Sequence, residues 1–426
     1  MNPLLSRKPL THPRRLQTVP LADFPAARQH WLNSERLRLY PAVLLACYLV
    51  FVVIRVYYLV WRHEAVGPLA GDFLPFWSAS YLALHGHAVD AYNVNALTAV
   101  ELHAMPYFSK VGGIMPWLYP PTFLLVVYPL ALVPYNVAAV AFVGGTCALF
   151  VTAIRAIVAE RMSTLLALAF PGIALVAIAG QNGALTAAIA GFGLVLLRRR
   201  PGVAGICLGL LCMKPQLAVL FPVALLCARS WRALASFSLT AGATLALAVL
   251  AFGTGTLSAF LQNAGMAAGC VEAGRAALAR MPSALAFVIM LHGPLGLAYI
   301  AQGVCALGAA AAVCYAWSGE CAYSLRAATL ICASLLVSPY LYDYDLVWYG
   351  VLIAWYCRHA MVRGWRRGER EWLVVLWLAP FAGTLAVTHV HVQFMPLISA
   401  ASLWMLVRRI AVERREPAVL QRGAGE

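Results

Sequence analysis

The chain has 426 residues, of which 62% are hydrophobic and only 11% are charged. A soluble domain carries about 25% charged residues, so this composition excludes a soluble enzyme, a disordered chain and a nucleic-acid-binding domain, and it favours a polytopic helical membrane protein. The net charge of +15 does not indicate nucleic acid, because the basic residues form short clusters between apolar runs, which is the pattern that sets orientation in a membrane.

The first apolar run predicts a transmembrane helix over residues 39–61. It follows a basic segment, 1–38, which lacks the short basic region and the small-residue cleavage site of a signal peptide. We therefore expect segment 1–38 to be cytoplasmic and the next polar stretch, 62–118, to be an external loop. The many aromatic residues of this loop favour short helices at the membrane interface.

Further apolar runs predict one all-α transmembrane bundle over residues 39–411, followed by a cytoplasmic tail, 412–426. Placing the basic clusters inside gives about twelve crossings, with both termini cytoplasmic. The run 119–134 is short and bracketed by proline, which fits a partly inserted hairpin. The segment 202–228 forms either two short helices, which the charge pattern favours, or one helix kinked at Pro215, in which case 119–134 crosses fully. The remaining runs are 136–157, 163–179, 183–197, 233–252, 295–317, 324–338, 344–358, 371–388 and 395–410.

Asp72 is the first candidate catalytic residue. It lies in Gly71–Asp72–Phe73, at the start of the expected external loop and among aromatic residues. A carboxylate that is ionised at neutral pH can take a proton from a substrate hydroxyl and so act as a general base. The alternative is a helix N-cap, because Asp is favoured there.

Lys214 is the lysine that falls within the apolar runs, directly before Pro215. An ammonium group inside a membrane is costly and indicates a function, and the proline marks a break in the helix. A cation beside a broken helix could bind a phosphate, although snorkelling to the interface is the alternative. Arg55 in the first run and Arg280 in the expected external segment 253–283 are further candidates for the same phosphate.

Two polar turns and one histidine are candidates for substrate binding. Gln181 and Asn182 form a turn between two apolar runs, and their amides could bind sugar hydroxyls. Tyr344 and Asp345 end a segment of alternating Asp and Tyr, which suits carbohydrate because Tyr offers a flat apolar face and Asp accepts hydrogen bonds. His389 belongs to an H-x-H pair with no third ligand at suitable spacing, so the pair does not indicate a metal, but His389 could contact a substrate.

Several short motifs, in this order, resemble glycosyltransferase family 87 of the GT-C superfamily, which includes polyprenol-phosphate-mannose-dependent mannosyltransferases of bacterial envelopes. The resemblance spans about residues 40–400. It is carried by Gly71–Asp72–Phe73, Phe76–Trp77–Ser78–Ala79, Ala91–Tyr92, Tyr119–Pro120–Pro121, Pro129–Leu130, Val133–Pro134, Gly180–Gln181–Asn182, Ala204–Gly205, Leu208–Gly209, Lys214–Pro215–Gln216, Ser338–Pro339 and Tyr344–Asp345.

The resemblance implies a GT-C-like fold and a polyprenyl-phosphate-sugar donor used on the outer face of the bacterial inner membrane. It implies that Asp72 is the catalytic base of an inverting transfer of a mannose-like hexose to an envelope lipid or glycan, with donor contacts near Lys214 and the Gln181 turn. We also expect Tyr119 to contact substrate. Some relatives carry paired histidines where this chain has Tyr344–Asp345. No metal cofactor is indicated, and the partners we expect are the donor, the acceptor and membrane lipids; the alternative function is a transporter or flippase of a lipid-linked substrate.

Overall fold

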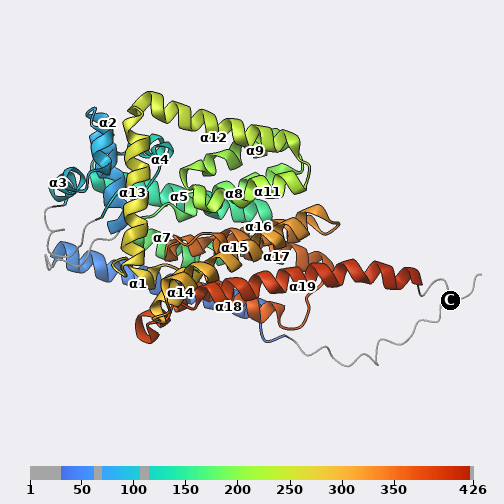
Figure 1. Ribbon diagram of the computed structural model, residues 1–426. Helices are drawn as coiled ribbons and strands as arrows, with labels where there is room; N and C mark the ends of the chain where they lie inside the picture. Colours follow the sequence, from blue (N-terminus) through green and yellow to red (C-terminus); the bar gives the residue numbers. More distant parts are fainter. Residues whose placement is uncertain (1–29, 62–69, 106–114, 423–426) are drawn as a thin grey trace, which may run out of the picture.

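The computed structural model describes residues 30–61, 70–105 and 115–422, and these residues form an all-helical bundle without strands (Figure 1). The α-helices are α1 (Ser34–Trp61), α2 (Leu74–Leu84), α3 (Val94–Ala104), α4 (Pro121–Val127), α5 (Tyr135–Ile157), α6 (Arg161–Leu168), α7 (Pro171–Ala179), α8 (Gly183–Leu197), α9 (Pro201–Gly209), α10 (Pro215–Ala218), α11 (Leu220–Cys227), α12 (Trp231–Phe252), α13 (Gly255–Glu272), α14 (Ala284–Met290), α15 (Leu295–Ser318), α16 (Tyr323–Val337), α17 (Trp348–Arg363), α18 (Glu369–Val390) and α19 (Met395–Arg422). Short 3₁₀ turns are η2 (Gly71–Phe73), η3 (Ala88–Tyr92), η5 (Leu130–Leu132), η6 (Leu210–Met213), η7 (Leu278–Arg280) and η8 (Asp343–Val347).

Six of the described helices are long and apolar enough to cross a membrane, and the count rises to seven if the bent pair α6 and α7 forms one span. These six are α1, α5, α12, α15, α18 and α19. Several shorter apolar stretches, such as Gly183–Leu197 and Tyr323–Val337, fall below the roughly 20 residues that a straight crossing needs. The membrane-protein prediction is supported, whereas the expected count of about twelve crossings is not confirmed.

The segment from Pro201 to Cys227 is a hairpin of short helices with its apex at Lys214. Gly205 and Gly209 of α9 pack closely against residues 233–240 of α12, in the same order along both helices. Helices α9 and α12 therefore run in the same direction. The chain must return to the end of the bundle where α9 begins before α12 can start, and α10 and α11 form this returning segment. The structure thus agrees with two short helices rather than one kinked helix.

The expected external loop contains short helices, as its aromatic composition predicted. Within it, α3 begins at the N-cap Asn93, whose side chain accepts hydrogen bonds from two backbone amides of the first turn. Phe76 of α2 contacts Trp117 and Tyr119 edge to face, with ring centroids 6.0 and 5.3 Å apart. This aromatic packing ties α2 to the chain that leads into α4. Residues 62–69 and 106–114 of this loop lie outside the described residues.

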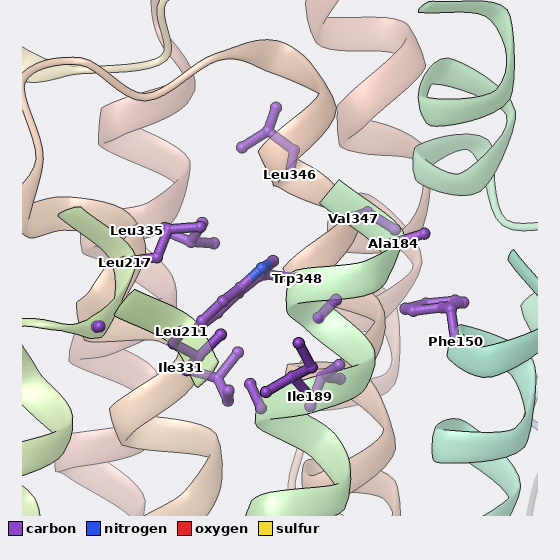
Figure 2. Packing of buried hydrophobic residues seen from close by; sticks show 14 of the residues in the cluster. Phe150, Ala184, Ile189, Leu211, Leu217, Ile331, Leu335, Leu346, Val347 and Trp348 are labelled. Carbon is purple, nitrogen blue, oxygen red and sulfur yellow. The ribbon is translucent and has the colours of Figure 1, made fainter. Parts of the chain in front are cut away.

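A tightly packed core lies directly behind η8. Figure 2 shows Trp348 among apolar side chains that come from separate elements, including Leu211, Leu217 and Ile331. The indole nitrogen of Trp348 donates a hydrogen bond to the hydroxyl of Thr186 at 3.1 Å. Because this fully buried tryptophan follows η8 directly, the core fixes the position of the turn that carries Asp343 and Asp345.

The start of the first described helix and the later part of the last one both lie near the start of α18. Trp31, just before α1, donates a hydrogen bond to Glu371 at the start of α18, and the later part of α19 contacts the same region through Arg409 and Glu369. Arg198 lies at this end too, because it follows α8, whose first residue, Gly183, packs near Tyr344 at the other end. Most of the expected basic segment, residues 1–29, lies outside the described residues, and the expected tail from residue 412 starts as a continuation of α19.

Candidate active site

Asp72 is presented by a tight turn that depends on a close approach between two segments. Ala70, in the left-handed conformation with φ of 59°, precedes η2 and donates its backbone N–H to the carbonyl of Ile178 at 2.8 Å. Gly180 ends α7 with φ of 79°, and a side chain there would lie 2.6 Å from the Cβ of Ala70. Glycine at position 180 therefore permits both the helix end and the contact that holds the Asp72 turn.

Arg280 of η7 joins Asp72 to Asp343. Its Nη2 donates to Oδ2 of Asp72 at 3.1 Å, and its Nε donates to Oδ2 of Asp343 at 3.0 Å. The three side chains are partly accessible, with exposed fractions of 37% for Arg280, 21% for Asp72 and 11% for Asp343. Burial lowers the pKa of Arg280, but the adjacent carboxylates of Asp343 and Asp72 outweigh it and raise this pKa above its ordinary value. Arg280 therefore stays charged, at a place that solutes can reach.

Lys214 forms a second ion pair, which is buried. Its Nζ donates to Oδ1 of Asp345 at 2.6 Å and to Oδ1 of Asn182 at 3.3 Å. The exposed fractions of the Lys214 and Asp345 side chains are 3% and 0%. Burial raises the pKa of Asp345, and the ammonium of Lys214 opposes that shift. The amide nitrogen of Asn182 is buried beside this pair without a partner among the described residues.

Tyrosine rings connect the two ion pairs. Tyr342 and Tyr344 stack with centroids 5.5 Å apart and ring planes inclined by 4°. Lys214 Nζ lies 4.8 Å from the centroid of Tyr344, and Arg280 Cζ lies 5.9 Å from the same point. The Tyr344 ring thus contacts both cations, an arrangement that favours each of them electrostatically.

Tyr119 and Gln181 extend the polar cluster. The Tyr119 hydroxyl donates to Oε1 of Gln181 at 2.7 Å. Burial raises the pKa of Tyr119, so its hydroxyl stays protonated and remains a donor. Gln181 also orders the turn before Asn182, since its Oε1 accepts from the backbone N–H of Asn182 at 3.4 Å.

Most of the residues that the sequence singled out gather at one end of the bundle. His389 does not join this cluster: it is exposed at the end of α18, where its ring contacts the hydroxyl of Thr388. Arg55 lies in α1, and its expected role at the donor phosphate stays a prediction. Asp343 was not assigned a role from the sequence, although it lies in the Asp-Tyr repeat that drew attention to Asp345. The spacing of that repeat marked both carboxylates, but only the structure shows that Asp343 binds Arg280.

The described residues contain no group of three or more His, Cys, Asp or Glu side chains placed to hold a metal ion. The expectation from the sequence that no metal cofactor is involved stays a prediction.

Comparisons with known proteins agree with the resemblance that the motifs carry. A family model for glycosyltransferase family 87 matches residues 117–339. No curated protein and no solved structure matches the chain. The family match spans Tyr119, Gln181, Lys214 and Arg280 of the cluster and ends just before its Asp-Tyr segment. Because the match covers more than half of the sequence, the chain belongs to glycosyltransferase family 87.

Proposed function

We propose that this membrane glycosyltransferase moves a mannose-like hexose from a polyprenyl-phosphate donor to a hydroxyl of an envelope lipid or glycan. The family supports sugar transfer, and the long apolar helices suit a donor that is carried by a lipid tail. The observation that carries the proposal is the pairing of the accessible Asp72 carboxylate with the Arg280 guanidinium at one end of the bundle. It brings a base for the acceptor and a cation for the leaving phosphate within one site.

In the proposed reaction, Asp72 removes the proton from the acceptor hydroxyl. The oxygen then attacks the anomeric carbon, a new C–O bond forms, and the bond from that carbon to the donor phosphate breaks. The polyprenyl phosphate leaves with the bonding electrons, and one displacement inverts the anomeric configuration. General base assistance of this kind contributes roughly 10²–10⁴-fold to a rate.

Arg280 is the cation best suited to the donor phosphate. It is partly exposed and offers several N–H donors in a planar fork that matches phosphate oxygens. A cation at this position stabilises the negative charge that develops on the leaving group. Lys214 is buried against Asp345, so we assign it the role of positioning η8, the turn that also carries Asp343, the partner of Arg280. Gln181 and Asn182 are proposed to contact the sugar hydroxyls.

We further propose that the site faces the outside of a bacterial inner membrane and that both termini are cytoplasmic. The support is the distribution of basic residues. Arg198, Arg199 and Arg200 follow the end of α8 that is distant from the site, and Arg408 and Arg409 lie in the later part of α19. Basic residues favour the cytoplasmic side, which leaves the opposite end of the bundle for the external active site.

The test is sugar transfer by the purified protein in detergent micelles. Labelled polyprenyl-phosphate mannose and related donors are supplied with envelope lipids, and labelled product is measured. Asp72→Asn should lower turnover by roughly 10²–10⁴-fold while thermal stability and monodispersity stay close to those of the parent. Asp90→Asn is the matched control, because Asp90 belongs to the same region but pairs with His87 at the surface.

If the folded Asp72→Asn variant transfers sugar at a near-normal rate, Asp72 is not the general base. Product formed in micelles also separates the enzyme from a transporter or flippase, because a transporter makes no new glycosidic bond. If neither polyprenyl-phosphate mannose nor any related donor supports transfer by the parent protein, the proposed donor class is wrong.

A further inference from the structure

A cavity lined by basic and apolar side chains lies at the other end of the bundle from the candidate active site. It has a volume of about 470 Å³ and lies between the start of α18 and the later part of α19. Gln393, just before α19, donates to the carbonyl of Ala279 beside Arg280. Arg409 lies about 21 Å beyond Met395, the first residue of α19, at about 1.5 Å per residue. The lining includes the basic residues Arg366, Arg367 and Arg408 and the apolar side chains of Trp372, Met405 and Val412.

The carboxylates next to this cavity are held by Arg409. Both oxygens of Glu369 accept hydrogen bonds from Nη1 of Arg409, at 2.9 and 3.1 Å. Oε1 of Glu413 accepts from Nε of Arg409 at 2.6 Å and lies 2.8 Å from Nε2 of His359. Arg409 therefore uses its charge within the protein.

Arg367 and Arg408 carry the positive charge that the cavity presents to its surroundings. Both are exposed, and within the described part of the chain neither has a carboxylate within ion-pair distance. The loop that carries Arg367 is held in place, because Nη2 of Arg409 donates to the carbonyl of Gly364 at 3.1 Å. Arg367, on the turn before α18, and Arg408, on α19, thus both line one cavity.

The floor of the cavity is apolar and ordered. Trp372 of α18 donates its indole N–H to the hydroxyl of Ser402 on α19 at 3.0 Å, which joins the two helices beneath the cavity. Met405 and Val412 continue this floor along α19. A ligand that matches both parts carries negative charge at one end and hydrocarbon next to it.

We propose that this cavity binds the headgroup of an anionic phospholipid from the adjacent leaflet. The phosphate lies between Arg367 and Arg408, and the glycerol and upper acyl carbons lie against Trp372 and Met405. Basic pockets between transmembrane helices are suited to such headgroups, and each basic residue contributes about 1 kcal/mol to the attraction. Removing both arginine charges should therefore weaken lipid binding about 30-fold, because 1.4 kcal/mol corresponds to tenfold.

The test measures lipid retention by native mass spectrometry of the full-length protein in detergent. The protein is incubated with equimolar phosphatidylglycerol and phosphatidylcholine that carry the same acyl chains. The parent should retain phosphatidylglycerol preferentially, and Arg367→Gln/Arg408→Gln should lose that preference. Arg199→Gln/Arg200→Gln is the matched control, because it removes two exposed arginine charges after α8, at the same end of the bundle but outside this cavity.

A parent protein without preference for phosphatidylglycerol overturns the proposal, and this measurement does not depend on any variant folding. Equal losses in the two double variants also overturn it, because they would show a general effect of surface charge. Inorganic phosphate at millimolar concentration should not displace the retained lipid, since it lacks the hydrocarbon that contacts Trp372. Displacement by phosphate alone would instead identify a simple anion site and contradict the lipid assignment.

Discussion

The buried pair of Lys214 and Asp345 gives the sharpest stability prediction. Nζ and Oδ1 are 2.6 Å apart, and the two side chains are 3% and 0% exposed. Removing one partner leaves an uncompensated charge in a low-dielectric interior, which costs about 3–5 kcal/mol. We therefore expect Lys214→Met and Asp345→Asn each to lower the unfolding free energy by about that amount.

The double variant Lys214→Met/Asp345→Asn should lose less than the sum of the two single losses, because it leaves no unpaired charge. Residues in direct contact show coupling energies of about 0.5–3 kcal/mol in double-mutant cycles, and this pair should lie at the upper end of that range. The assay is thermal unfolding of the purified protein in detergent, with the three variants compared under one condition. Asp90→Asn is the control: it breaks an exposed pair with His87, so its effect should stay below about 1 kcal/mol.

Additive losses in the double variant would refute this reasoning, because they would mean that the two charges do not compensate each other. Single variants as stable as the parent would refute it as well, since a buried unpaired charge cannot be free of cost.

Two further predictions concern Glu101 of α3 and Gly180 at the end of α7. Glu101 is fully buried without a hydrogen-bond partner among the described residues, and burial raises its pKa from 4.5 to about 7. The folded protein therefore binds the proton more tightly than the unfolded chain, and stability falls as pH rises from about 4.5 to about 7. Glu101→Gln should consequently stabilise the protein by about 3 kcal/mol at pH 8, and thermal unfolding at several pH values should show this gain disappear near pH 4.5; a pH-independent gain would contradict it. Gly180→Ala should lower both stability and sugar transfer, because the added Cβ would lie 2.6 Å from that of Ala70 and displace the Asp72 turn. Thermal unfolding and transfer assays check this against Gly86→Ala, which has a similar φ of 80° but no neighbour within 4 Å and should leave transfer unchanged.

The sequence predicted the residue types of the site better than their pairing. Lys214 and Asp345 could each be identified, one as a charge inside an apolar run and the other from its Asp-Tyr repeat. Their contact spans 131 residues of chain, and no local pattern encodes a pairing at that separation. The role of Asp343 was missed for the same reason, because its partner Arg280 lies in a distant segment whose only local signal is a charge outside the apolar runs.

The number of crossings was harder to predict than the presence of a membrane domain. Composition alone indicates a bundle of membrane helices, and the long apolar run that forms α15 clearly predicts a membrane-spanning helix. Runs such as the one that forms α8 are too short for a straight crossing yet as apolar as true spans. Hydropathy does not distinguish a short crossing from a helix packed against other helices, whereas the three-dimensional contacts of Gly205 and Gly209 do reveal the path of the 201–227 hairpin.

The ion pairs Arg280–Asp72 and Lys214–Asp345 differ in burial, and this difference gives them different roles in the proposed reaction. The Arg280–Asp72 pair is partly open to solvent, with Arg280 37% and Asp72 21% exposed, so a donor phosphate can reach Arg280 and replace Asp72 as its partner. The same exchange at Lys214 would leave Asp345 buried and unpaired, which costs about 3–5 kcal/mol. Donor binding at Arg280 would also release Asp72 from its hydrogen bond and free its carboxylate for the acceptor hydroxyl. The base would then become available when the donor is in place, which disfavours activation of the acceptor in an empty site.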